Sequence, residues 1–438
     1  MKKTPKRIAS KKCPGTLLLG WNRIAEKSPI GFHNIHPSAD SQDQEIVRLE
    51  DEEGSMMTVA PTGRGKGRCS LIPNMLTWEG SAVVIDPKGE CAHVTARRRR
   101  EMGQQVVMLD PFNLITNKPD TLNPLDVMSY ADNSPEAFSL SAVSLLHPDH
   151  KQSLQDIFWD HQADALLSAV ICYILACEPE EKRHFARLRE LLMADDTVYG
   201  LAVIMDTVGK QMPKMASQQI ASFLSTEDKC RSGILATATQ HLRILGDPRV
   251  ANSLGSTSFS LEDFRKGKPM TIYMILPPQR LHSHGLLLRN WVATLLEVAM
   301  SRETLPKTTT LFMLDEVAQL GKLSSLVTAI TLLRGYGIRC WLYVQSLNQI
   351  KTLYPDCWQT ITDNLATVQT FGVANYPMAR DLSELFGDVK ADDLLKLSPD
   401  EQMILRTGGK VTRMRKLDYL KDPLFKGMFD NNPRYPGR

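Results

Sequence analysis

The sequence has no apolar run long enough to cross a membrane. The longest apolar stretch in its 438 residues, Ala165–Cys177, is bounded by Asp164 and Glu178 and is shorter than the roughly 20 residues that a spanning helix needs. The basic N-terminus is not followed by an apolar segment of the length that a signal peptide requires. We therefore expect no membrane span, and we interpret Ala165–Cys177 as part of a buried helix.

Paired cysteines and clustered metal ligands are also missing. The eight cysteines form no C-x-x-C motif, and the ten histidines have no cysteines or carboxylates at the spacing of a metal site. This usage is typical of reduced thiols and argues against a disulfide framework or a zinc site. The hydrophobic content of 42% and the charged content of 23% exclude a disordered or collagen-like chain, and the length favours two or three domains.

The net charge of +3 is unevenly distributed. Residues 126–262 carry 18 acidic and 11 basic side chains, whereas residues 406–438 carry three acidic and nine basic ones. The first twelve residues hold six basic side chains and no acidic one. The basic flanks suggest an anionic partner and the acidic middle a different contact surface, although ordinary solvated faces explain such runs equally well. For Arg97–Arg100 we favour a solvated face.

Seven short apolar runs indicate an α/β fold. They are continuous rather than alternating and are separated by helical stretches, which is typical of a mostly parallel sheet covered on both faces. The runs that we predict as strands are Met56–Ala60, Ala82–Asp86, Val106–Asp110, Thr271–Leu276, Leu311–Asp315, Cys340–Gln345 and Val368–Phe371.

Between the third and the fourth of these runs the strand pattern is interrupted by helical candidates. They are Gln155–Cys177, Phe185–Met193, Val198–Met205 and Met215–Leu224. We therefore expect an all-α domain at residues 126–262, inserted into a sheet domain formed by residues 51–125 and by residues 263–438 with the C-terminal tail. Residues 1–50 are polar and mixed, and we expect them to form an irregular N-terminal region.

A glycine-rich loop follows the first predicted strand. Ala60–Gly67 reads Ala-Pro-Thr-Gly-Arg-Gly-Lys-Gly and precedes a helix that we expect from Arg68. A strand, a glycine-rich loop and a helix together suit a phosphate cradle, because the loop N–H groups and the helix N-terminus point at the anion. Lys66 would reach the β- and γ-phosphates. We assign nucleotide binding to Thr62, Gly63, Arg64, Gly65, Lys66, Gly67 and Arg68.

Two positions of this loop differ from the usual pattern G-x-x-x-x-G-K-[ST]. Ala60 replaces the first glycine, and Gly67 replaces the hydroxyl residue that normally binds Mg²⁺. A plain glycine-proline turn is the alternative interpretation of the loop taken alone.

Two adjacent carboxylates follow another predicted strand. Asp315 can hold the Mg²⁺ shell, and Glu316 can orient and deprotonate an attacking water. A charged strand-to-helix turn is the alternative. Because the loop and the carboxylates occur in one α/β chain, we favour ATP hydrolysis with Mg²⁺.

Arg334 and Gln345 complete the predicted site. Arg334 lies in the turn Leu333–Gly337, which precedes a predicted strand, and Gln345 ends that strand. Gln345 can sense the γ-phosphate, and Arg334 can enter the site of a neighbouring subunit as a finger. An isolated subunit would then be a poor enzyme, and a ring would be the active form.

Eight motifs occur in order along the chain: Ala60–Gly67, Ile72–Asn74, Asp86–Glu90, Leu122–Asp126, Ser232–Leu235, Leu314–Glu316, Leu333–Gly337 and Val344–Ser346. Their sequences resemble those of the type IV secretion coupling proteins, the VirD4/TraG/TraD family. The resemblance implies a RecA-like P-loop ATPase domain with an inserted all-α domain, and many members carry a glycine after the Walker lysine. By position it implies that Lys66 binds phosphate and Asp315 binds Mg²⁺. It likewise implies that Glu316 is the base, Arg334 the finger and Gln345 the sensor.

The resemblance also implies a hexameric ring that hydrolyses ATP and moves DNA, single-stranded in its pore, toward a type IV secretion channel. The all-α domain would bind the relaxase or other substrate proteins, and its negative charge fits a protein better than a phosphate backbone. Coupling proteins usually begin with transmembrane helices, which this chain lacks. Three explanations stay open: the anchor is a separate polypeptide, the sequence is a trimmed one, or the chain is a soluble relative. We favour a cytoplasmic form, which a partner protein would hold at the inner membrane.

Two other functions fit the sequence. One is a receptor for relaxase or effector proteins that the nucleotide switches and that moves no DNA, as the acidic insert suggests. The other is a soluble DNA-pumping ATPase of mobile-element maintenance or defence.

Overall fold

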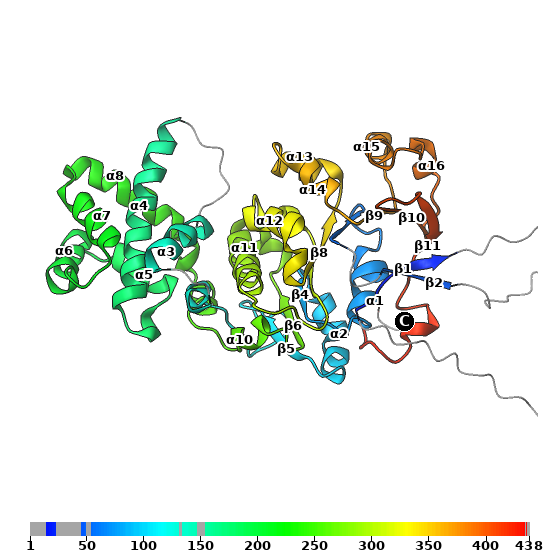
Figure 1. The fold of residues 1–438 in the computed structure, drawn as a ribbon, viewed down its shortest axis with the longest axis horizontal. Coiled ribbons are helices and arrows are strands. Elements are labelled where there is room, and N and C mark those ends of the chain that lie inside the picture. Colours follow the sequence, from blue (N-terminus) through cyan, green and yellow to red (C-terminus); the bar gives the residue numbers. More distant parts are fainter. Residues whose placement is uncertain are drawn as a thin grey trace, which may run out of the picture.

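The computed structural model describes residues 15–22, 45–49, 54–130, 134–146, 154–433 and 435, except for the side chains of residues 154–156, 333 and 334. The described part is elongated, with a group of helices at one end and the sheet with its covering helices along the rest (Figure 1). The sheet has 11 strands in the order β2-β1-β11-β10-β9-β3-β8-β7-β4-β6-β5. The six basic side chains near the N-terminus lie outside the described residues.

The seven predicted strands form the parallel half of this sheet, which confirms the α/β prediction. Neighbouring strands in this half all run parallel, so their carboxyl ends meet at one edge. The observed bounds are β3 (Met56–Val59), β4 (Ala82–Ile85), β5 (Gln105–Leu109), β6 (Met270–Met274), β7 (Thr310–Leu314), β8 (Ile338–Val344) and β9 (Thr367–Thr370).

Four further strands, which the sequence did not predict, extend the sheet beyond β9 in antiparallel pairs. They are β1 (Leu17–Asn22), β2 (Glu45–Leu49), β10 (Glu401–Arg406) and β11 (Thr412–Arg415). The expectation of an irregular region over residues 1–50 is therefore wrong for β1 and β2. These two strands pair with each other, and β1 also pairs with β11 near the other end of the chain, so the buried Leu17–Leu19 completes the core there.

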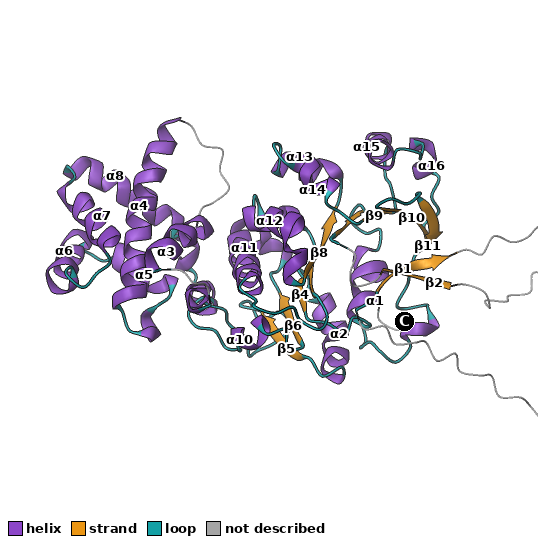
Figure 2. Cartoon of the chain, in the orientation of Figure 1, coloured by secondary structure: helices purple, strands orange, loops and turns teal. Residues whose placement is uncertain are grey.

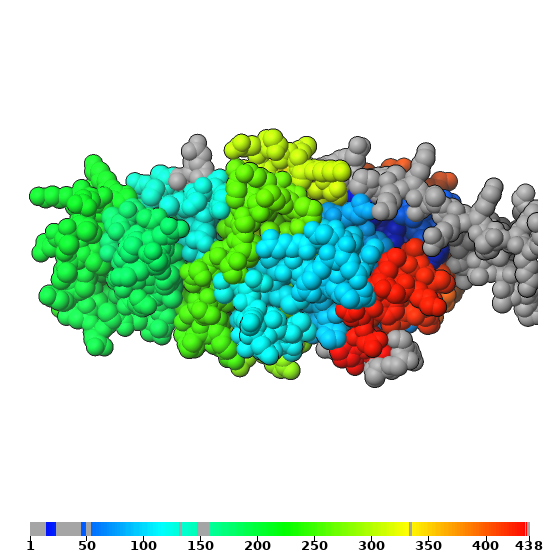
Figure 3. All heavy atoms as spheres, turned by 90° about the horizontal axis from the view of Figure 1, so that it is seen from below, coloured from blue at the N-terminus to red at the C-terminus, as the bar shows by residue number. Residues whose placement is uncertain are grey.

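Helices cover both faces of the parallel half (Figure 1). One face carries α1 (Ile72–Met75) and α2 (Glu90–Glu101). The C-terminal residues lie against this region, where Asn432 Nδ2 donates to Glu90 Oε1 at 2.7 Å (Figure 3). The other face carries α11 (Pro278–Met300), α12 (Ser324–Leu332), α13 (Leu347–Leu353), α14 (Trp358–Asp363), α15 (Tyr376–Phe386) and α16 (Ala391–Leu395).

Between β5 and β6 the described residues form helices and turns (Figure 2). The four predicted helices agree with α4 to α7 to within three residues at each end. None of the described helices combines the length and the apolar character that a bilayer span requires. The helices are α3 (Pro135–Val143), α4 (Leu154–Cys177), α5 (Phe185–Leu192), α6 (Thr197–Val208), α7 (Lys214–Ser225), α8 (Asp228–His241), α9 (Pro248–Ser253) and α10 (Leu261–Arg265).

Arg99 corrects the expectation that Arg97–Arg100 is a solvated face. Its side chain is fully buried, and its guanidinium donates to the carbonyls of Trp78 and Gly80 and to Thr271 Oγ1. These acceptors lie in the turn before β4 and on β6, where the arginine supplies donors that the strands do not. The sequence could not show this, because the acceptors are distant from α2 along the chain.

Replacing Arg99 with leucine should lower the free energy of unfolding by about 3 kcal/mol, since several buried acceptors lose their donor. Urea unfolding followed by circular dichroism measures the change. The matched control is Arg100→Leu on the exposed side of α2, which should alter stability by less than about 0.5 kcal/mol. Equal losses in the two variants would contradict the role assigned to Arg99.

Candidate nucleotide site

The glycine-rich loop begins where β3 ends, and the N–H of Ala60 still bonds to β8 at 3.0 Å. Gly63 and Gly65 then have φ values of 77° and 99°, a region that is open to glycine and strained for other residues. A π-helical turn, Gly67–Leu71, and α1 follow directly. The helix expected from Arg68 is therefore present, and its first turn is wider than an α-helix.

Lys66 lies beneath this loop. Its ammonium donates to Ala60 O at 2.9 Å and lies 3.8 Å from Glu316 Oε1. The lysine is only 8% exposed, whereas Thr62, Gly63 and Arg64 at the tip of the loop are exposed. The backbone of the loop is thus open to a ligand, with one buried positive charge behind it.

Asp315 and Glu316 follow β7, which lies two strands from β3. Glu316 adopts a left-handed conformation with φ of 54°, which is uncommon for a residue other than glycine and is often found at functional sites. Its N–H donates to Asp315 Oδ1 at 3.1 Å. This turn directs the Glu316 carboxylate toward the loop and toward Lys66.

Gln345 follows β8, the strand between β3 and β7. Its Nε2 donates to Glu316 Oε2 at 2.9 Å, and its backbone N–H donates to Gln349 Oε1 at 2.7 Å. The structure therefore brings Lys66, Glu316 and Gln345 together at the edge where three neighbouring strands end.

Asp86 belongs to the same edge, and the sequence analysis did not include it among the site residues. It follows β4, whose last residue pairs with the last residue of β7, and its Oδ2 accepts from Ala92 N at 2.7 Å. Burial raises the pKa of Asp86 to about 7, and the charge of Asp315 adds to the shift. Burial likewise raises the pKa of Asp315 to about 6, followed by the charge of Glu316. The signal that identified Asp315, a carboxylate at a strand end, also applied to Asp86.

Arg68 and the backbone of Arg64 contact the C-terminal segment. Arg68 forms a two-pronged pair with Asp418 at 2.7 and 2.5 Å, and its guanidinium lies 5.5 Å from the ring centre of Tyr435. Lys416 Nζ donates to the carbonyl of Arg64 at 3.2 Å. Arg64, Arg68 and three C-terminal residues, Lys416, Asp418 and Tyr435, line a hollow of about 400 Å³ beside the loop. The C-terminal segment thus contributes a wall that the sequence analysis missed.

Arg334 lies at the opposite end of the strands, on the side of the sheet where the parallel strands begin. Its turn, Leu333–Tyr336, precedes β8, whereas Gln345 follows it. The strand spans about 20 Å, so the backbone of Arg334 and the Lys66–Glu316 pair are separated by the height of the sheet within one chain. The structure does not bring Arg334 to the other predicted residues, and its side chain lies outside the described part.

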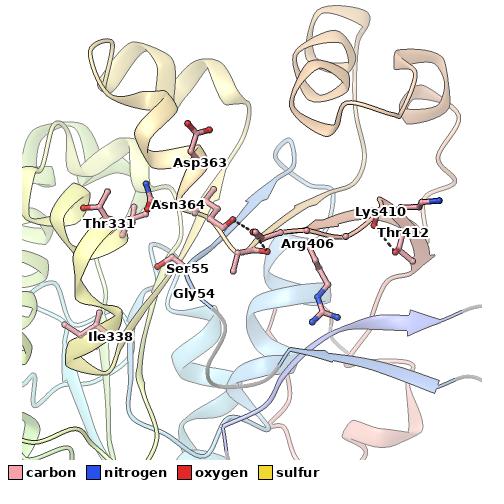
Figure 4. A pocket seen from close by; sticks show the side chains of 15 residues that line it. Gly54, Ser55, Thr331, Ile338, Asp363, Asn364, Arg406, Lys410 and Thr412 are labelled. Carbon is pink, nitrogen blue, oxygen red and sulfur yellow. Dashed lines mark hydrogen bonds between the residues drawn. The ribbon is translucent and has the colours of Figure 1, made fainter.

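A hollow of about 900 Å³ shares this second edge with the Arg334 turn. Figure 4 shows Thr331 and Asn364 on its helical side and Arg406 and Lys410 on the side of the β10–β11 hairpin, with Ser55 between them. It lies where β3, β8 and β9 begin. The larger hollow is therefore separate from the predicted nucleotide site at the strand ends.

The chain matches the model of a family described as type IV secretory system conjugative DNA transfer over residues 40–393. The conjugal transfer protein TraG of Agrobacterium fabrum is 30% identical over 299 residues, which cover 67% of this chain and 44% of TraG. The coupling protein VirD4 of Bartonella quintana is 26% identical over 344 residues, 77% of this chain and 53% of VirD4. The chain spans about half the length of these relatives.

Solved structures of the bacterial conjugative coupling protein TrwB share the fold. The unbound monoclinic form has a TM-score of 0.65 and 16% identity, covering 85% of this chain and 87% of that one. The TrwB complex with ADP and Mg²⁺ has a TM-score of 0.63 and 15% identity, with the same coverage of both chains. These matches confirm the predicted RecA-like α/β fold.

Proposed function

This chain belongs to the type IV secretory system conjugative DNA transfer family, and we propose that it is an ATP-driven DNA translocase that serves as a coupling protein. The observation that carries the proposal is the division of the site between two edges of one sheet. Lys66, Glu316 and Gln345 gather where the strands end, and the Arg334 turn lies where β8 begins. A complete site then requires two copies of the chain.

ATP and Mg²⁺ are the ligands that fit the site formed by Lys66, Glu316 and Gln345 at the carboxyl ends of the strands. TrwB, which shares the fold, was solved with a non-hydrolysable ATP analogue and with ADP and Mg²⁺. In this chain the loop and Lys66 would bind the phosphates, and the hollow beside Arg68 and Tyr435 would receive the nucleoside.

Asp315 and Asp86 form a donor set that suits Mg²⁺. Both are carboxylates at neighbouring strand ends whose burial disfavours the charged form, so a cation between them would stabilise both. The described residues contain no group of three or more metal-binding side chains, which agrees with an ion that takes its other ligands from phosphate and water. When bound, Mg²⁺ would neutralise charge that develops on the phosphates.

Glu316 is placed to act on water. Its carboxylate lies between Lys66 and Gln345. A triphosphate in the loop would draw the Lys66 ammonium onto its terminal oxygens, which leaves Glu316 to accept a proton from the attacking water. Gln345 would orient that water or the carboxylate through its amide.

The edge that carries Arg334 has features of a contact surface. Leu305, Leu332 and Tyr336 are apolar or aromatic side chains near or within this turn, and they are 64%, 70% and 42% exposed. Apolar side chains that gather on a surface favour association. If this edge meets the strand-end edge of the next copy, the contact is head-to-tail and closes into a ring, with Arg334 entering the neighbour's site.

The direct test is ATP hydrolysis by the purified chain with and without DNA. Turnover should rise with DNA and with protein concentration, since the site forms between copies. Lys66→Ala should reduce ATP binding by at least about 10²-fold, because the phosphates lose a buried cation. The control Lys351→Ala removes a lysine on α13 that pairs with Asp381 and should retain binding. A chain that shows no hydrolysis with any DNA at any concentration would refute the motor.

The helices between β5 and β6 carry a surface suited to substrate proteins, as the acidic charge of residues 126–262 suggested. Met193, Tyr199 and Val203 are 48%, 68% and 43% exposed around the start of α6, and Asp195 and Asp206 are exposed beside them. Apolar side chains with acidic neighbours would bind a basic segment with apolar residues of its own.

Tyr199→Ser combined with Val203→Ser should weaken binding of a conjugative relaxase by about 10-fold or more, as the loss of apolar contacts implies. Surface plasmon resonance measures the affinity, and Lys210→Ser, at an exposed residue in the turn after α6, is the control. Undiminished binding by the double variant would place the partner elsewhere. If the double variant loses relaxase binding and DNA does not change the rate of ATP hydrolysis by the unaltered chain, the results favour the nucleotide-switched receptor over the DNA translocase.

A further inference from the structure

Arg302 is a buried arginine that the proposed chemistry does not use. It lies between α11 and β7, and its side chain is 8% exposed. Burial lowers the pKa of its guanidinium to about 10, so it remains charged at neutral pH. Its guanidinium donates to the carbonyls of Phe264 (3.2 Å), Arg265 (3.0 Å), Tyr336 (3.3 Å) and Gly337 (3.1 Å) and to Thr310 Oγ1 (2.7 Å).

These acceptors come from three segments that are distant in sequence. Phe264 and Arg265 lie in α10, the last helix before β6. Thr310 begins β7, the strand that ends at the catalytic carboxylates. The other two acceptors close the turn that carries Arg334. One side chain thus joins the helical segment before β6, the carboxylate strand and the arginine turn.

Pro306 fills the space between two of the same segments. A Cβ on Gly267 would lie 2.4 Å from Pro306 Cβ, and a Cβ on Gly337 would lie 2.6 Å from Pro306 Cδ. Both glycines therefore allow the proline to fit against them, and a larger residue at either position would push the segments apart. Arg302 and Pro306 together fix the spacing between the turn after α10 and the Arg334 turn.

The described side chains next to Arg334 lie on the surface. Leu332, before the turn, and Tyr336, at its end, are exposed, so side-chain packing holds these two residues weakly. The backbone of the turn is held by Arg302 and by Thr310, whose N–H donates to Gly337 O at 2.8 Å. The Arg302 and Thr310 hydrogen bonds therefore act together with the Pro306 contact to position the turn.

We propose that Arg302 is a positioning residue for catalysis, which holds the turn of Arg334 in the place from which it enters the neighbouring subunit's site. The inference rests on the proposed function, because it requires Arg334 to act in trans. Arginine suits the task, since its planar fork binds several carbonyls at once, whereas a lysine is a single flexible point charge. A displacement of a catalytic group by about 1 Å can slow a reaction about 10²-fold.

The test compares Arg302→Lys with Arg99→Lys in the full chain. Arg99 is also buried and also binds backbone carbonyls, but it lies on the other face of the sheet. Arg302→Lys should lower kcat for DNA-stimulated hydrolysis about 10- to 100-fold and leave the affinity for a non-hydrolysable ATP analogue within about twofold. Arg99→Lys should lose similar stability and keep kcat. Combined with Arg334→Ala, Arg302→Lys should cause no further loss, because both act on one step.

Thr310→Val is the milder second variant, which removes one acceptor and keeps the shape of β7. It should lower kcat by a smaller factor than Arg302→Lys. If Arg302→Lys does not fold, the kcat of Thr310→Val tests the positioning role instead. Full kcat in the folded variants would overturn the proposal. The proposal would also be overturned if Arg302→Lys lowered kcat and nucleotide affinity together and Arg99→Lys had the same effect. If Arg334→Ala itself keeps full turnover, the trans arginine of the proposed function fails first.

Discussion

An Arg334→Ala variant is expected to hydrolyse ATP about 10³- to 10⁵-fold more slowly than the unaltered chain, the range that arginine fingers supply in phosphoryl transfer. The physical reason is the geometry of β8, which separates the Arg334 turn from Lys66 and Glu316 of the same chain. The guanidinium can stabilise the transition state only in a neighbour's site. Phosphate release at saturating ATP, DNA and protein measures the loss.

The same variant should keep its affinity for ATP, because the loop and Lys66 belong to its own chain. The matched control is Arg380→Ala, which removes an exposed arginine on α15 that pairs with Glu384 and should change turnover less than about twofold. Turnover by Arg334→Ala within the same twofold range would show that this arginine takes no part in hydrolysis.

A Glu316→Gln variant is expected to lose about 10²- to 10⁴-fold in turnover while it binds ATP at least as tightly as before. Glutamine keeps the shape and the contact with Gln345, but it cannot accept the proton of the attacking water. The substitution also removes the negative charge of Glu316, which lies 3.8 Å from the Lys66 ammonium. That charge would repel the phosphates, so its loss should favour ATP binding. The nucleotide retained by the purified variant should therefore be ATP, which chromatography of the released nucleotide identifies.

The control for this variant is Glu101→Gln, at an exposed glutamate on α2 that pairs with Arg97. It should turn over ATP at the unaltered rate and retain no trapped ATP. Rapid hydrolysis by Glu316→Gln would remove the assigned base and transfer that role to another group at the strand-end edge.

The sequence predicted the parallel half of the sheet because most of its strands are buried on both faces and read as mainly apolar runs. The antiparallel strands β2, β10 and β11 lack this pattern, and in β1 it covers only Leu17–Leu19. β10 begins with Glu401 and ends with Arg406, and β11 has a single buried side chain, Met414. β1 and β11 also pair across nearly the whole chain, with Trp21 opposite Arg415. A strand whose partner is so distant leaves no local signal of its pairing.

Of the predicted site residues, the structure brings together those that stand at strand ends, since parallel topology places such ends side by side. The surroundings of Arg68 could not be predicted in the same way. Its partner Asp418 is distant in the sequence and belongs to no motif. The basic tail shows the same limitation, because Arg413 and Arg415 pair with Glu401 and Asp422 within the fold. Part of the charge that suggested an anionic partner is thus used internally.

The most direct test of a site shared between copies is to mix two inactive variants, Glu316→Gln and Arg334→Ala. In a head-to-tail ring assembled from equal amounts, about a quarter of the contacts join an intact Glu316 to an intact Arg334 from the neighbour. Hydrolysis should therefore reappear on mixing and reach a fraction of the unaltered rate. If mixtures at every ratio stay as inactive as the separate variants, although the subunits assemble together, the site is not formed between copies and the account is wrong.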